Sequence, residues 1–191
     1  MTDSIRAVFL DMHNKFRSSL ARGLEADGLG GNAPKAAKML KMVYDCDVEA
    51  SAIKYAKQCY FAHSPFSDRP GLGENLFMTD ALNYDKIKAA ELASKEWWVE
   101  LKDYGIGQEN ILTDALWNRG VLIGHYTQMA WDTTYRLGCA VEHCPDMTYV
   151  VCHYGPMGNI MDQLIYTIGE PCSQCPPSYT CSKDEGLCTP A

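Results

Sequence analysis

The stretch TYRLGCAVEHCPDMTYVVCHYG, residues 134–155, decides how the rest of the chain is interpreted. Two runs rich in Val, Tyr and Thr alternate with period two on either side of CPD, which is typical of a β-hairpin. Opposite residues in a regular antiparallel hairpin have a constant index sum, so Cys139 and Cys152 are centred on a turn between Pro145 and Asp146. Their Cβ atoms would lie about 4.5–5.5 Å apart, which predicts a Cys139–Cys152 disulfide.

Outside the hairpin, apolar residues recur with helical spacing. This pattern predicts amphipathic helices within residues 4–23, 42–59 and 85–105 and a short helix in residues 125–131. Asp45 or Asp47 is the expected N-cap of the second helix, and Gly105 ends the third. Residues 60–75 are rich in Pro and Gly, so we expect no long regular structure there.

Length and charge limit the classes of protein. The chain has 191 residues and a net charge of −7, and no basic cluster is interleaved with aromatic residues. Nucleic acid and anionic membrane surfaces are therefore poor candidate partners, and no apolar run of about 18 residues predicts a transmembrane segment. We expect one main domain over residues 1–168 and a small cysteine-rich extension over residues 169–191.

Nine cysteines indicate a disulfide framework and hence an oxidising, extracellular compartment. A secreted protein carries a signal peptide, so we expect Met1 to begin a mature chain whose targeting segment is missing. In the extension, the pattern C-x2-C-x5-C-x6-C lacks a histidine and lies among prolines. This favours two structural disulfides over a zinc knot or a redox pair.

The common catalytic motifs are absent: there is no HExxH and no G-x-S-x-G. His13 and Arg17, one turn apart, are expected at a helix surface, bonded to nearby backbone. The remaining polar candidates stand in segments that otherwise read as buried or tightly turned: His63, Glu74, Glu100 and His125. Such residues either converge to bind a divalent cation or to move protons, or act as independent surface and cap residues.

Four motifs in order resemble the CAP superfamily of cysteine-rich secretory, antigen 5 and pathogenesis-related proteins. They are HNKFR (13–17), GENL (73–76), GHYTQMAWDTT (124–134) and YVVCHYGPMGNI (149–160). The likeness runs from about Ser4 to Tyr166 and is strongest to single-domain activation-associated secreted proteins of parasitic nematodes.

The resemblance implies an α+β fold, a three-layer α-β-α sandwich with a large cleft. A tetrad of two histidines and two glutamates projects into that cleft in the family; here its members are His63, Glu74, Glu100 and His125. The resemblance also implies that His63 and His125 can hold zinc or a similar ion, while no cofactor is required. Gln128 and Trp131 are expected to pack or to line the cleft wall.

The family's disulfide pattern implies four pairs in this chain: Cys59–Cys144, Cys139–Cys152, Cys172–Cys181 and Cys175–Cys188. Cys46 is left over. Its partner stands upstream of Met1, or the residue is free, buried, or bonded to a second chain in a disulfide-linked homodimer.

For function, the resemblance favours extracellular binding over catalysis. The expected partner is a host or other extracellular protein, or a lipid or sterol. The alternative is a metal-dependent extracellular hydrolase or protease, in which Glu74 or Glu100 acts as the general base on metal-bound water.

Overall fold

The computed structural model describes residues 1–191, which form two compact units. The first unit comprises Met1–His13, Met42–Glu96 and Tyr135–Met157, and the second comprises Asn14–Lys41, Trp97–Thr134 and Gly158–Ala191. Each unit contains both helices and strands, so the fold is α+β, as the sequence predicts.

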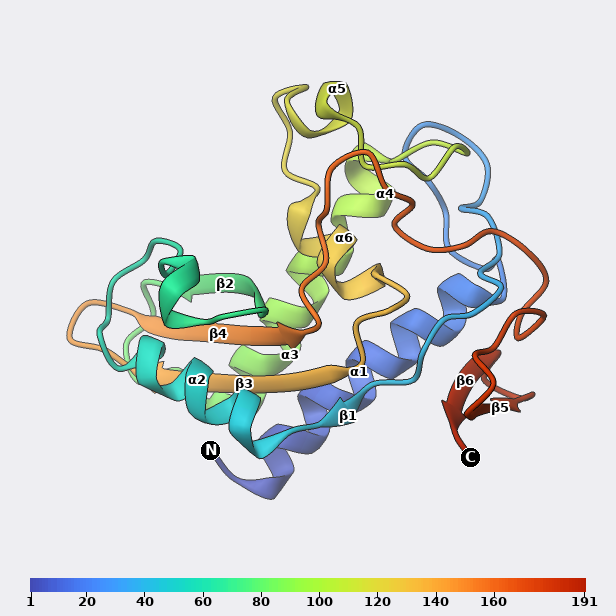
Figure 1. Ribbon diagram of the computed structural model, residues 1–191. Coiled ribbons are helices and arrows are strands. Elements are labelled where there is room, and N and C mark those ends of the chain that lie inside the picture. The colour runs from blue at the N-terminus through green and yellow to red at the C-terminus, as the bar shows by residue number, and fades with distance from the viewer. The chain divides into compact units, whose positions relative to one another are not determined.

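The first unit is built around a sheet (Figure 1). Its strands are β1 (Val43–Tyr44), β2 (Gly73–Thr79), β3 (Arg136–His143) and β4 (Thr148–Gly155). Its helices are α2 (Cys46–Ala56), the short 3-10 helix η1 (Phe66–Asp68), and the larger parts of α1 (Asp3–Ala21) and α3 (Lys86–Trp98). The second unit adds α4 (Glu100–Tyr104), α5 (Asp114–Trp117), α6 (Gly124–Ala130), β5 (Tyr179–Ser182) and β6 (Leu187–Pro190).

The predicted hairpin forms the centre of the sheet, whose strand order is β1-β3-β4-β2. β4 pairs antiparallel with both β2 and β3, and β1 pairs parallel with β3. Cys139 lies opposite Cys152 and is bonded to it, which confirms the register predicted from the index sum.

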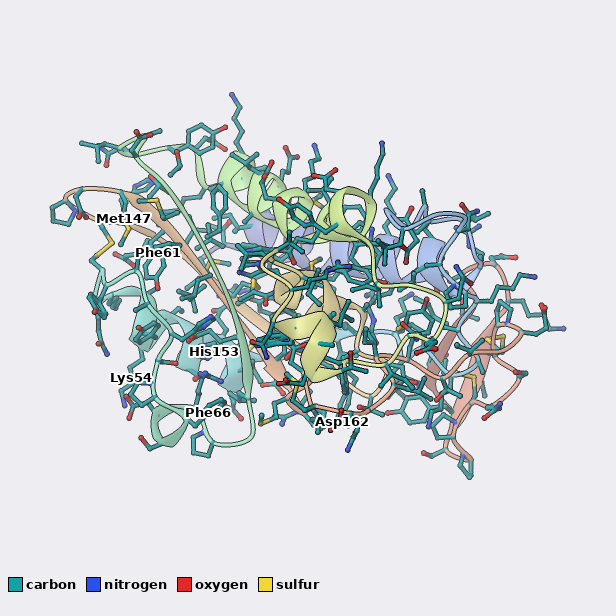
Figure 2. All side chains as sticks on the ribbon, turned by 90° about the horizontal axis from the view of Figure 1, so that it is seen from above. Lys54, Phe61, Phe66, Met147, His153 and Asp162 are labelled. Atoms are coloured by element: carbon teal, nitrogen blue, oxygen red, sulfur yellow. A yellow bond between two sulfur atoms is a disulfide. The ribbon has the colours of Figure 1, made fainter.

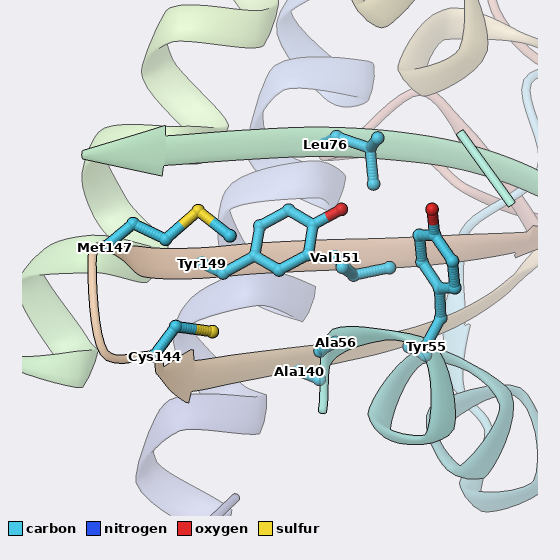
Figure 3. Packing of buried hydrophobic residues seen from close by; sticks show 9 residues of the cluster. Tyr55, Ala56, Leu76, Ala140, Cys144, Met147, Tyr149 and Val151 are labelled. Carbon is cyan, nitrogen blue, oxygen red and sulfur yellow. The ribbon is translucent and has the colours of Figure 1, made fainter. Parts of the chain in front are cut away.

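Helices cover both faces of this sheet, so the first unit has three layers (Figure 3). α2 lies on one face, where Ala52, Tyr55 and Ala56 join a buried cluster with Leu76, Ala140, Tyr149 and Val151. α1 and α3 lie behind the other face. Because side chains alternate along a strand, odd-numbered residues of β4 such as His153 face α2, and even-numbered ones such as Tyr154 face α1.

Gly138 allows α2 to lie close against β3. A Cβ atom on Gly138 would stand 2.0 Å from the backbone nitrogen of Glu49, a distance that no side chain could occupy. The residue opposite Gly138 in the hairpin is His153, so the close approach of α2 occurs beside this histidine.

The structure differs from the sequence predictions about regular structure in two places. The third helix was predicted as continuous over residues 85–105, but α3 ends at Trp98 and α4 begins at Glu100, with a break at Val99. Residues 60–75 hold no long regular structure, as predicted, but the strand β2, which begins at Gly73 and runs on to Thr79, was not predicted. Pairing with β4 supplies the strand that local sequence did not indicate.

The prediction that His13 and Arg17 lie at a helix surface is wrong, because both are fully buried. His13 contacts the Phe9 carbonyl through Nδ1 (2.7 Å) and the Tyr154 hydroxyl through Nε2 (2.8 Å) in the first unit. Arg17, in the second unit, donates to the carbonyl oxygens of Leu40, Met129, Trp131, Asp132 and Thr134. This ring of carbonyl dipoles lets the guanidinium remain charged in the interior.

Four disulfides tie the chain, and they are the pairs that the family resemblance implies. Cys59–Cys144 and Cys139–Cys152 lie in the first unit, and Cys172–Cys181 and Cys175–Cys188 hold the small β5–β6 sheet of the second. Cys46 is unpaired and exposed at the start of α2, which rules out the buried alternative for this chain.

Candidate functional site

His63 and Glu74 form the first of two histidine–carboxylate pairs. His63 Nδ1 lies 2.8 Å from Glu74 Oε1, and the His63 side chain is 61% exposed whereas that of Glu74 is fully buried. Glu74 is the second residue of β2 and lies opposite His153 of β4, so its side chain is directed to the α2 face of the sheet. The exposed imidazole is thus held from beneath by a buried carboxylate.

The Glu74 carboxylate accepts four hydrogen bonds. Oε1 accepts from His63 and from the Ser64 amide (2.9 Å), and Oε2 accepts from the Ser64 hydroxyl (2.6 Å) and from His153 Nε2 (2.8 Å). Burial by itself would raise the pKa of Glu74, but these hydrogen bonds outweigh burial and hold that pKa well below its usual value. Glu74 is therefore ionised, and both of its oxygens are engaged.

Arg69 supports this carboxylate from the loop that precedes β2. Its Nε donates to the Ser64 hydroxyl at 2.8 Å and lies 3.7 Å from Glu74 Oε2. The Arg69 guanidinium is buried beneath the exposed ring of Phe66, 4.4 Å from the ring centroid. Burial lowers the pKa of Arg69. Figure 2 shows Phe66, in η1, at the edge of the first unit and His153 in its interior.

Glu100 and His125 form the second pair, within the second unit. His125 Nδ1 lies 2.7 Å from Glu100 Oε2, while Glu100 Oε1 accepts from the backbone N–H of Tyr126 at 2.8 Å. The N-cap of α6, Ile123, supplies no side-chain hydrogen bond, so Glu100 satisfies one of the donors left open at the start of that helix. The His125 ring is stacked on Trp97, with centroids 6.2 Å apart.

The four predicted residues therefore form two pairs of the same construction. In each pair a buried glutamate contacts Nδ1 of the imidazole and fixes its plane, which makes Nε2 the nitrogen that a metal would use. Neutral imidazole is a good ligand for zinc, so each of the two histidines is suited to bind such an ion. Glu74 lacks a vacant oxygen for direct ligation, and its role in this geometry is to orient His63.

Gln128 and Trp131 are buried, as the resemblance implies for packing residues. The Gln128 side chain accepts from the Gly158 amide at 3.0 Å and donates to the Thr134 hydroxyl at 3.3 Å. It thereby joins α6 to the segment after β4 within the second unit.

Sequence reasoning missed His153 and Ser51. His153 Nε2 contacts Glu74, and its Nδ1 lies 2.7 Å from the hydroxyl of Ser51 on α2. The hairpin register already placed His153 opposite Gly138. On that face of the sheet the absence of a side chain at Gly138 leaves room for α2. Its contact with Glu74 could not be inferred, because β2 was not predicted as a strand.

A further group of possible ligands lies in the extension. The Sγ atoms of three cysteines all lie within 4.8 Å of one another: Cys172, Cys175 and Cys188. All three belong to disulfides, and a disulfide sulfur is not the thiolate that binds zinc. The extension is therefore held by its two bridges, as the cysteine spacing predicts.

Residues 10–154 match the CAP family, the cysteine-rich secretory protein family, and the chain therefore belongs to it. It is similar to the Ancylostoma secreted protein of Ancylostoma caninum, with 66% identity over 190 residues that cover 99% of this chain and 45% of that protein. Among solved structures it is similar to Na-ASP-1, with a TM-score of 0.97, 66% identity, and coverage of 98% of this chain and 47% of that one. The chain spans just under half the length of these two relatives.

A second solved relative is NaASP2, whose crystal structure was determined with Zn²⁺. The TM-score is 0.94 and the identity 55%, and the match covers 98% of this chain and 96% of that one.

The protein is secreted and extracellular, in agreement with its four disulfides and with the secreted relative it matches. None of its helices combines the length and the apolar character that crossing a bilayer requires.

Proposed function

We propose that this secreted CAP protein acts by extracellular binding and that His63 and His125 are metal-binding histidines, with zinc as the first candidate. The observation that carries the proposal is the shared construction of the two pairs, each with Nδ1 on a buried glutamate. A carboxylate that accepts a hydrogen bond from the other ring nitrogen fixes the tautomer of a metal-binding histidine and makes the histidine a stronger ligand. The relative NaASP2, crystallised with Zn²⁺, supports the choice of metal.

The partner that we propose is another extracellular protein, such as a host protein, or a lipid or sterol. Large apolar side chains are exposed in the second unit and would suit either class: Leu24, Leu29, Trp117, Leu122, Met161 and Leu164. Direct binding assays with immobilised host extracellular proteins and with labelled sterol separate the two. Saturable binding to one and not the other assigns the class, and binding to neither contradicts this part of the proposal.

The alternative, a metal-dependent hydrolase, is less well supported by the geometry. A general base works best with a pKa near the operating pH, whereas the hydrogen bonds to Glu74 hold its pKa well below the usual value. Both Glu74 oxygens are also occupied by donors. Glu100 is the better candidate base, and zinc-dependent peptide hydrolysis abolished by Glu100→Gln would establish the enzyme instead.

Calorimetric zinc titration tests the metal proposal. We expect the wild type to bind zinc, and His63→Ala and His125→Ala each to weaken binding by at least about tenfold, since each removes a ligand. His143→Ala is the matched control, because His143 is an exposed histidine of β3 that contacts the Tyr84 carbonyl (2.8 Å). Equal zinc affinity in all four proteins would overturn the proposal.

A further inference from the structure

Glu74 connects the exposed His63 to a second, buried histidine. From Glu74 the hydrogen-bonded chain continues through His153, whose side chain is 1% exposed, to the hydroxyl of Ser51 on α2. The Ser51 hydroxyl lies 2.7 Å from His153 Nδ1, and His153 Nε2 lies 2.8 Å from Glu74 Oε2. Glu74 Oε1 in turn lies 2.8 Å from His63 Nδ1. An exposed imidazole is thereby linked to a helix on the covered face of the sheet.

The direction of each hydrogen bond follows from the other donors around Glu74. The Ser64 amide donates to Oε1 and the Ser64 hydroxyl donates to Oε2, so both oxygens are acceptors and His153 Nε2 and His63 Nδ1 each carry a proton. In a neutral His153 ring, Nδ1 is then the acceptor for the Ser51 hydroxyl. Ser51 therefore selects the tautomer of His153 that donates to Glu74.

We infer that His153 and Ser51 are positioning residues which, through Glu74, fix the orientation and the Nδ1–H tautomer of His63 and thereby set its affinity for zinc. The part concerning zinc rests on the proposed function. Neither residue contacts His63 directly in this chain of hydrogen bonds, so both act through the carboxylate. Loss of His153 would remove one of the two donors to Glu74 Oε2 and leave the carboxylate attached only on its loop side.

The second pair provides a control within the same molecule. Glu100 is held by the backbone N–H of Tyr126 and by His125, and not by this relay. Replacement of His153 should therefore change the tautomer of His63 and leave the tautomer of His125 unchanged in the metal-free protein.

The experiment is ¹⁵N NMR of the histidine rings in the metal-free full chain at about pH 8, above the usual histidine pKa of about 6.5. Wild type is compared with His153→Phe, which keeps a ring of similar size, and with Ser51→Ala, which removes only a hydroxyl on a partly exposed residue. His143→Gln is the control for loss of a histidine in the same unit. Zinc titration of the same four proteins follows.

We expect His63 to be predominantly the Nδ1–H tautomer in the wild type and to become a mixture in His153→Phe, with a smaller change in Ser51→Ala. Zinc affinity should fall by about 10–100-fold in His153→Phe, the usual effect of losing such a supporting contact. Lower thermal stability with an unchanged His63 tautomer in both variants would overturn the inference. If His153→Phe does not fold, Ser51→Ala decides.

The two proposals can fail separately. A wild type that binds no zinc, but whose His63 tautomer responds to Ser51→Ala and His153→Phe, refutes the metal site and supports the positioning role. If the wild type and both folded variants bind zinc with equal affinity and share the same His63 tautomer, the positioning role alone is refuted.

Discussion

Glu74 of β2 lies directly opposite His153 of β4, and its carboxylate accepts a 2.8 Å hydrogen bond from the His153 ring. This pair joins the edge strand to the central hairpin on the face that α2 covers. His63 is hydrogen-bonded to the other oxygen of the same carboxylate, so one buried carboxylate contacts both a strand of the sheet and the exposed imidazole.

The depressed pKa of Glu74 predicts a loss of stability in acid. Because the folded-state pKa lies below the ordinary glutamate value of about 4.3, the stabilisation is complete above that pH and is lost as the pH falls toward the folded-state value. Glu74→Gln should be less stable than wild type at neutral pH, and the difference should shrink as the pH is lowered from about 5 to 2. Urea unfolding across this range measures it.

Glu96→Gln, at an exposed position of α3, is the control and should leave the pH dependence unchanged. A Glu74→Gln variant whose destabilisation is the same at every pH would contradict the assignment of an ionised, hydrogen-bonded Glu74.

Arg17→Met should destabilise the protein strongly. The substitution preserves much of the side-chain volume but removes the donors to five buried carbonyl oxygens. The Trp131 and Asp132 oxygens keep a backbone hydrogen bond, and each buried acceptor that is left without a partner costs about 1–3 kcal/mol. We expect a decrease of at least about 3 kcal/mol in the free energy of unfolding. Lys15→Met, on the exposed side of the same helix, should change it by less than about 0.5 kcal/mol. Similar values for the two variants would show that the carbonyl ring contributes little.

Gly138→Ala should push α2 away from β3, because the added Cβ would meet backbone atoms of Val48 and Glu49 that cannot move independently. Overpacking of this kind costs about 1–3 kcal/mol, and we expect a value near the upper end. At Gly169 the nearest atom to an added Cβ is the Ala37 Cβ at 3.0 Å, so Gly169→Ala should cost less. Thermal unfolding of both variants checks the order, and the reverse order would contradict the close approach of α2.

Cys46 should be the cysteine that forms any disulfide between chains, because it is the unpaired and exposed one. We expect one thiol per folded chain to react with a thiol reagent, and mild oxidation to produce a dimer on non-reducing electrophoresis. Cys46→Ser should show neither. A dimer band that persists in Cys46→Ser would mean that one of the four intrachain bridges had exchanged instead.

The part of the fold that could be predicted from sequence is the part with a local signal. Period-two alternation and two cysteines placed the hairpin and its register, and Asp45 is indeed the N-cap of α2. The strand β2 has no such signal, since its pairing partner β4 lies about 75 residues away and long-range pairing decides its conformation.

The same reason limited prediction of the site. The sequence named four candidates, His63, Glu74, Glu100 and His125, but only the family resemblance grouped them, because their partners come from distant segments. Arg17 was misplaced although a signal existed: Phe9, His13 and Arg17 follow one another at i, i+4 spacing on the buried stripe of α1. Arg17 was predicted at the surface because it is charged, although its spacing placed it on the buried stripe. In the structure the surrounding carbonyl groups accept its hydrogen bonds and make its burial favourable.

X-ray absorption spectroscopy of the zinc-loaded protein identifies the atoms that bind the metal. We expect a zinc ion with imidazole nitrogen ligands at about 2.0–2.1 Å, a signal that is lost in the His63→Ala/His125→Ala double variant and retained in His143→Ala. A first shell with sulfur at about 2.3 Å, or an unchanged spectrum in the double variant, would contradict this expectation.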